Sequence, residues 1–139
     1  MADDAPVTVQ VASDADIVRA RQIGRQMASA LGFSDTDLTL VATAISELAR
    51  NITLYAGSGE IVLRVIADSR REGIEVVARD RGPGIEDIER AMQDGFTTGE
   101  GMGLGLPGAR RLMDELTLVA PLGVGTTVTV RKWKYRRAV

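Results

Sequence analysis

A stripe of apolar side chains between residues 38 and 55 most constrains how this chain can fold. Its members recur at intervals of three and four residues: Leu38, Val41, Ile45, Leu48, Ile52 and Tyr55. This spacing predicts an α-helix with one continuous core-facing side. Ser34 is placed to cap its start, with Asp37 three residues later, and Gly57 follows its end. Such a helix needs a second apolar layer to cover that side.

The rest of the chain supplies that layer in short segments. Valines alternate with polar residues at 7, 9 and 11, and a second helix is predicted from Ser13 to a stop at Gly32. Further strands are predicted at 60–67, 73–79, 116–120 and 126–133, and further helices at 85–94 and 104–115. Strands joined by short turns favour an α+β fold, a two-layer α/β sandwich whose mixed, largely antiparallel sheet has helices on one face. We expect residues 1–139 to form this single domain.

The absence of two residue types limits the available chemistry. The sequence has no histidine and no cysteine, which excludes Ser-His triads, imidazole acid–base catalysis, thiolate nucleophiles and zinc sites built from these residues. Chemistry must use carboxylates, amides, hydroxyls and backbone groups, with a hard cation such as Mg²⁺. A net charge of −2 gives no general attraction to nucleic acid or anionic membrane. Without a leader-like segment or an apolar run of about 20 residues, we expect a cytoplasmic protein.

Two polar residues flank the apolar stripe of the long helix. Glu47 and Asn51 are four residues apart and therefore lie one above the other. An amide oxygen is a good neutral ligand for Mg²⁺, and a carboxylate one turn away could accept a proton from a hydroxyl group. On these two residues alone, an ordinary polar pair at a helix edge is the simpler interpretation.

A short loop after a predicted strand contains Asp80, Gly82 and Gly84. Its glycines allow the backbone to approach a ligand closely, and Asp80 could accept a hydrogen bond from an exocyclic amine such as that of adenine. An ordinary turn explains Gly-Pro-Gly equally well when the loop is taken alone.

A second loop, 99–108, contains five glycines, among them Gly101, Gly103 and Gly105, and leads into a predicted helix. Free N–H groups and a helix N-terminus suit phosphate groups. The loop lacks the Gly-Lys-Ser/Thr ending of a P-loop, and no strand feeds it directly as in a Rossmann fold. A merely flexible loop is the remaining alternative.

Taken in order, these segments resemble the boxes of the GHKL (Bergerat-fold) ATPase/kinase superfamily, which includes gyrase, MutL and histidine kinases. Residues 47–51 look like its N box, 80–84 like its G1 box, 101–105 like its G2 box, and Gly125-Thr126-Thr127 like its late Gly-Thr element. The resemblance extends from about residue 14 to residue 133. Within the superfamily, residues 45–48, 82–85, 103–115 and 126–133 are most similar to the RsbT switch-kinase family of bacterial partner-switching (stress or development) pathways.

The resemblance implies a role for each candidate residue. Glu47 would be the general base, and Asn51 would bind the Mg²⁺ that bridges the ATP phosphates. Asp80 and Gly82 belong to the G1 segment, where Asp80 would form a hydrogen bond with adenine. Gly84 and Thr126 would line the adenine pocket. Gly101, Gly103 and Gly105 would wrap the phosphates beneath a short lid, Phe96–Glu100. The implied substrates are STAS-domain proteins, and release from them would free the kinase for a downstream phosphatase.

One position departs from the superfamily pattern. A basic residue usually stands three residues after the asparagine, where this chain has Leu54; Arg50, Arg81 or a residue of the lid could compensate. A serine/threonine protein kinase is the first interpretation, and a nucleotide-binding anti-sigma factor or sequestration module with weak or no kinase activity is the alternative. A gyrase-like ATPase is disfavoured because it needs a transducer domain, and a histidine kinase because there is no histidine to phosphorylate.

Overall fold

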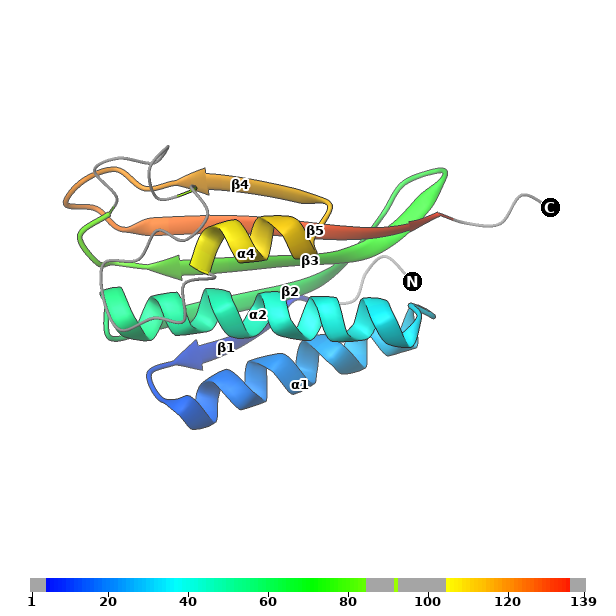
Figure 1. Ribbon diagram of the computed structural model, residues 1–139, viewed down its shortest axis with the longest axis horizontal. Coiled ribbons are helices and arrows are strands. Elements are labelled where there is room, and N and C mark those ends of the chain that lie inside the picture. The colour runs from blue at the N-terminus through cyan, green and yellow to red at the C-terminus, as the bar shows by residue number, and fades with distance from the viewer. Residues whose placement is uncertain (1–4, 85–91, 93–104, 136–139) are drawn as a thin grey trace.

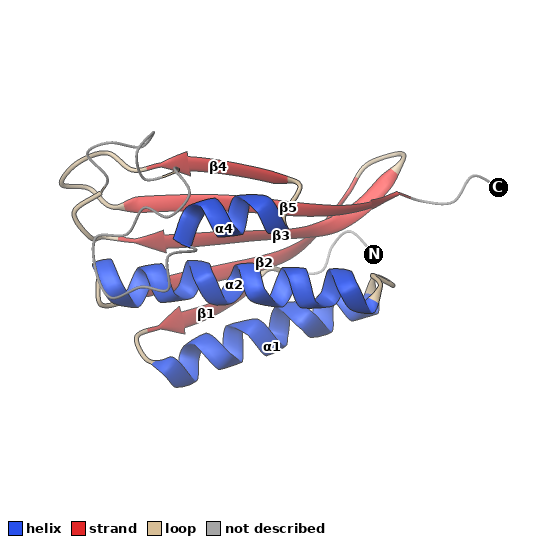
Figure 2. Cartoon of the chain, in the orientation of Figure 1, coloured by secondary structure: helices blue, strands red, loops and turns tan. Residues whose placement is uncertain are grey.

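The computed structural model describes residues 5–84, 92 and 105–135. In this part of the chain, a five-stranded sheet forms one layer and three helices form the other, all on one face of the sheet (Figure 1). Figure 2 shows the two layers by type of structure. The elements are β1 (Val7–Val11), α1 (Asp14–Ala30), α2 (Asp35–Tyr55), β2 (Gly59–Ala67), β3 (Arg71–Asp80), α4 (Gly105–Leu112), β4 (Glu115–Val119) and β5 (Thr126–Tyr135). This is the expected α+β sandwich.

The strands lie in the order β1-β2-β3-β5-β4, and each neighbouring pair is antiparallel. The central strand β3 pairs with β2 on one side and with β5 on the other. Asp80, its last residue, lies opposite Gly59 at the start of β2 and opposite Thr126 at the start of β5. The sheet therefore brings three distant parts of the sequence to one edge.

Both long helices start at the predicted serines. The Ser13 hydroxyl accepts a hydrogen bond from the Asp16 N–H at 3.3 Å, and the Ser34 hydroxyl accepts one from the Asp37 N–H at 3.2 Å. Gly32 follows α1 with a φ of 87°, a left-handed conformation that ends the helix and suits glycine. Serine caps and a glycine stop thus set the limits of α1 and the start of α2.

The predicted stripe of α2 is buried from Leu38 to Ile52, but Tyr55 is 44% exposed. Tyr55 is the last helical residue, so the buried stripe ends one turn before it. Gly24 favours close packing of α1 on α2, because a Cβ there would force the terminal methyl of Ile45 to move.

Some predicted limits differ from those in the structure. Strand β5 extends to Tyr135, and β3 begins at Arg71. Helix α4 ends at Leu112, earlier than predicted, because the Asp114 N–H already donates to the Arg131 carbonyl of β5. The predicted helix at 85–94 lies outside the described residues, apart from Met92. No helix in the described ranges has the length and apolar character needed to span a membrane.

The sheet face opposite the helices carries a row of charged side chains. Arg64, Glu75, Arg131 and Glu115 are register partners across β2, β3, β5 and β4. Arg64 Nε and Arg131 Nε donate to the two carboxylate oxygens of Glu75 at 2.6 and 2.8 Å. Glu75 is only 4% exposed. Burial raises the pKa of Glu75, but the hydrogen bonds from both arginines outweigh it, so that its pKa is below its ordinary value.

Candidate nucleotide-binding site

The Asp80 carboxylate connects two parts of the candidate site. Its Oδ1 accepts hydrogen bonds from the Gly82 N–H at 2.8 Å and from the Thr126 N–H at 3.3 Å. Among the described residues, both N–H groups donate to the same oxygen, Asp80 Oδ1. The carboxylate is therefore oriented by the backbone of its own loop and by the first residue of β5, and Oδ2 is the oxygen through which it could accept a bond from a ligand amine.

Helix α2 lies close to Asp80 because two positions carry no side chain. A Cβ at Gly59 would lie 2.8 Å from Ile52 Cγ2 and 3.1 Å from Asp80 Cβ. A Cβ at Gly82 would lie 2.9 Å from the Cβ of Ala56, which caps α2. Both glycines thus let the last turns of α2 pack against the Asp80 loop. Local sequence patterns alone do not reveal this requirement for glycine at position 59.

The Asp80 loop is joined on its other side to the β4–β5 turn. The Gly123 N–H donates to the Pro83 carbonyl at 2.9 Å. Gly84 has a φ of 78° and Gly125 a φ of 137°, values that side chains rarely adopt. A Cβ at Gly84 would collide with the Pro121 carbonyl, and one at Gly125 with the Asp80 carbonyl. The predicted Gly84 and Thr126 are therefore brought together with Asp80, and Gly125 is an essential part of this packing.

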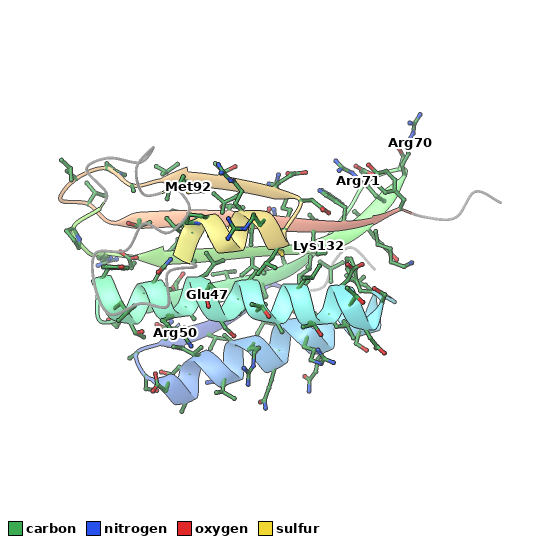
Figure 3. The ribbon with its side chains drawn as sticks, viewed as in Figure 1. Glu47, Arg50, Arg70, Arg71, Met92 and Lys132 are labelled. Carbon is green, nitrogen blue, oxygen red and sulfur yellow. The ribbon has the colours of Figure 1, made fainter. Side chains whose placement is uncertain are left out.

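Glu47 and Asn51 lie one turn apart in the C-terminal half of α2. Figure 3 labels Glu47 on this helix. Glu47 is 8% exposed, an unusual burial for a carboxylate. Arg50 Nη1 lies 3.6 Å from Glu47 Oε1. This ion pair was not predicted, although Arg50 had been considered as a substitute for a missing cation. Leu54 is 47% exposed, and Arg81 is also exposed.

The glycine-rich loop is only partly described. Gly105 is the first residue of α4, which packs alongside α2 (Figure 1). Gly101, Gly103 and the predicted lid Phe96–Glu100 lie outside the described residues. The helix that the loop enters is thus placed next to the helix that carries Glu47 and Asn51.

Comparison with known proteins shows the family of this chain. Residues 11–132 match the family described as histidine kinase-like ATPase domain. The chain belongs to this family.

The relatives include a serine/threonine kinase. The chain is 50% identical over 125 residues to the serine/threonine-protein kinase RsbT of Bacillus subtilis, covering 90% of this chain and 94% of that protein. It is 34% identical over 120 residues to the anti-sigma F factor of Caldanaerobacter subterraneus subsp. tengcongensis, covering 82% of each.

Solved structures share the fold. The crystal structure of the RsbU and RsbW domains of a Mycobacterium tuberculosis protein aligns with a TM-score of 0.64 at 20% identity, over 97% of this chain and 34% of that one. The mycobacterial sensor histidine kinase MprB aligns with a TM-score of 0.55 at 20% identity, over 96% of this chain and 99% of that chain. At this identity the likeness supports the fold alone.

Proposed function

We propose that this protein is a serine/threonine protein kinase of a bacterial partner-switching pathway, with ATP as the phosphoryl donor. The observation that carries the proposal is the Asp80 carboxylate, which the Gly82 and Thr126 N–H groups orient beside the end of α2. The 50% identity to a serine/threonine kinase of similar length supports protein phosphorylation over ATP hydrolysis alone.

The nucleotide would bind along the edge where β3, β5 and α2 meet. Asp80 would accept a hydrogen bond from the adenine amine, in a pocket that Gly82, Gly84 and Thr126 help to form. Gly101, Gly103 and Gly105 would surround the phosphates with backbone N–H groups, and the N-terminus of α4 favours their negative charge.

Asn51 is the residue proposed to hold Mg²⁺. In the described ranges, no three acidic, histidine or cysteine side chains cluster as a metal cage. One amide oxygen together with phosphate oxygens and water is a common ligand set for this ion, so the residues present fit a shared protein–phosphate site. The bound ion would neutralise charge on the phosphates.

Glu47 would act as the general base. The hydroxyl oxygen of a partner's serine or threonine attacks the γ-phosphorus, and the bond from that phosphorus to the ADP oxygen breaks. The hydroxyl proton passes to the Glu47 carboxylate, which can receive it because it is an acceptor one turn from Asn51 on the same helix face.

The proposed substrates are STAS-domain proteins in the cytoplasm. Phosphorylation would release the kinase from them, and the freed kinase would engage a downstream phosphatase. Neither nucleic acid nor membrane is expected as a partner, since the chain carries a net charge of only −2.

A second candidate function is a nucleotide-binding sequestration module, such as an anti-sigma factor with weak or no kinase activity. The 34% identity to an anti-sigma F factor favours it. The exposed apolar side chain of Leu54, where a cation could have assisted transfer, favours it as well.

Incubation with γ-labelled ATP, Mg²⁺ and purified STAS proteins tests the proposal. The set comprises wild type, Glu47→Gln, Asn51→Ala and a control, Glu72→Gln, whose residue lies at the opposite end of β3 from Asp80. Transfer by wild type and the control, but not by the other two variants, supports the kinase. Tight partner binding without transfer by wild type supports sequestration. If ATP fails to raise the melting temperature of the wild type, the nucleotide site itself is wrong.

A further inference from the structure

The ion pair between Glu47 and Arg50 lies at the centre of the proposed reaction. Arg50 stands one turn after Glu47 and directly before Asn51 on α2, and its Nη1 lies 3.6 Å from Glu47 Oε1 (Figure 3). The side chain of Glu47 is 11% exposed, whereas that of Arg50 is 40% exposed. The guanidinium therefore reaches a nearly buried carboxylate from the solvent side.

A contribution to folding stability does not explain why Glu47 and Arg50 form this ion pair. Ion pairs three residues apart on a helix contribute little to folding, and less when one partner is well solvated. The separation of 3.6 Å is also longer than a charge-assisted hydrogen bond. The arginine thus attracts the carboxylate without using up its oxygens as acceptors.

Arg50 is the one described cation within ion-pair distance of Glu47. Between described residues, the Glu47 carboxylate accepts no hydrogen bond that would fix its orientation. A glutamate side chain has several rotatable bonds, and a general base must lie within hydrogen-bond reach of the proton that it takes. Within the described residues, Arg50 is therefore the charged group that can orient this carboxylate.

Leu54 cannot share this task. It follows Arg50 by one turn on the same side of α2 and is exposed, but its side chain carries no charge. A cation placed there would lie two turns from Glu47, and would be closer to the Mg²⁺ and phosphates proposed at Asn51 than to the base.

We propose that Arg50 is a positioning residue for phosphoryl transfer: it holds the Glu47 carboxylate in the orientation that receives the proton, and it does so without binding the nucleotide. This role rests on the proposed function, because it requires Glu47 to be the base. The geometry distinguishes it from a phosphate ligand, because the guanidinium is directed to the carboxylate along the helix.

The test compares steady-state phosphorylation by wild type, Arg50→Gln, Arg50→Lys and a control, Arg25→Gln. Arg25 is an exposed arginine on α1, so its replacement by glutamine removes the same charge at a distant position. We expect Arg50→Gln to lower kcat by about two- to threefold, because so weak a pair biases the orientation of the carboxylate by no more than that factor. KM for ATP and the ATP-induced rise in melting temperature stay at their wild-type values. Arg50→Lys recovers most of kcat, and Arg25→Gln equals wild type.

A double-mutant cycle with Glu47→Gln shows whether Arg50 acts through the base. In the Glu47→Gln background, Arg50→Gln should cause no further loss of the residual rate, because the group that it positions is already gone. An undiminished further loss overturns the role. A rise in KM for ATP at constant kcat also overturns it, since this result would make Arg50 a nucleotide ligand.

Adding Leu54→Lys to Arg50→Gln separates positioning from general charge. The second substitution should leave the rate low; recovery of kcat would show that any nearby cation suffices and would overturn the role.

Failure of the proposed function and failure of the proposed role of Arg50 give different results. Absence of transfer by wild type overturns the proposed function and this role together, whereas wild-type transfer with an unchanged kcat in Arg50→Gln overturns the role alone.

Discussion

Two buried glutamates of this protein are held in very different ways. Glu75, on the open face of the sheet, is 4% exposed, and two arginines bond its two carboxylate oxygens at 2.6 and 2.8 Å. Glu47, on α2, is 8% exposed and has one guanidinium at 3.6 Å. Burial alone therefore does not distinguish a structural carboxylate from the one that we propose to be the general base.

The two glutamates differ in whether their carboxylate oxygens are available to a substrate. The oxygens of Glu75 are both engaged by neighbouring strands, so a new proton or hydrogen-bond donor would have to displace an arginine. Glu47 is largely shielded and has one distant cation as its partner, which suits a group that must accept a proton during a reaction. The comparison predicts that changes at Glu47 affect activity, whereas changes at Glu75 affect stability.

The largest effect is expected for Glu47→Gln. This substitution keeps the shape of the side chain but removes its ability to accept the proton, so kcat should fall by about 100- to 10,000-fold. Phosphorylation of the partner measures kcat, and urea denaturation should give nearly the wild-type free energy of unfolding. A large loss of stability with little loss of kcat would reverse the comparison.

Substitution of the other glutamate, Glu75→Gln, should lower the free energy of unfolding by about 1–2 kcal/mol. Its charged bonds to Arg64 and Arg131 are weakened, but both arginines are well solvated, which limits the loss. Chemical denaturation measures this change. The folded variant should keep kcat within about twofold of wild type, and a lower kcat at full folding would mean that the sheet face takes part in the reaction.

Acid should remove the contribution that the charged bonds of Glu75 make to the free energy of unfolding. Because the pKa of Glu75 is lowered in the folded protein, its bonds stabilise the fold above the ordinary carboxyl range and are lost as the pH falls through the folded pKa. The stability difference between wild type and Glu75→Gln should therefore be constant near neutral pH and shrink below about pH 4.3. Denaturation curves at several pH values measure it. A difference that grew in acid would contradict the lowered pKa.

The smallest effect is expected for the stability of Arg50→Gln. The pair with Glu47 is long, and the Arg50 side chain is 40% exposed, so its loss should change the free energy of unfolding by less than about 0.5 kcal/mol. Thermal and urea denaturation measure this. A stability loss as large as that of Glu75→Gln would mean that the two glutamates are held in the same way.

Much of this architecture could be predicted because the signals are local. The serine caps, the glycine stop after α1 and the apolar stripe of α2 depend on spacing within one element. The convergence of Asp80 and Thr126 was implied by a family resemblance rather than by local pattern, because these residues meet only through the register of β3 and β5.

Other features could not be predicted, because they depend on contacts between residues that are distant in the sequence or on the choice of one side-chain rotamer. Glu75 alternates with Ile74 and Val76 and is typical of a solvated strand position; it is buried because arginines from β2 and β5 lie against it. The need for glycine at 59 and 125 arises from backbone and side chains distant in sequence. The contact of Arg50 with Glu47 depends on one rotamer among many, which spacing permits but does not select.

The two N–H groups that donate to Asp80 also make the site observable. Gly82 and Thr126 are 44 positions apart in the sequence, and a single carboxylate oxygen receives both bonds. Amide hydrogen exchange at these two positions therefore reports on the surroundings of one carboxylate oxygen. Slower exchange at both upon addition of nucleotide, measured residue by residue, would follow occupancy of the proposed site without a partner protein or turnover.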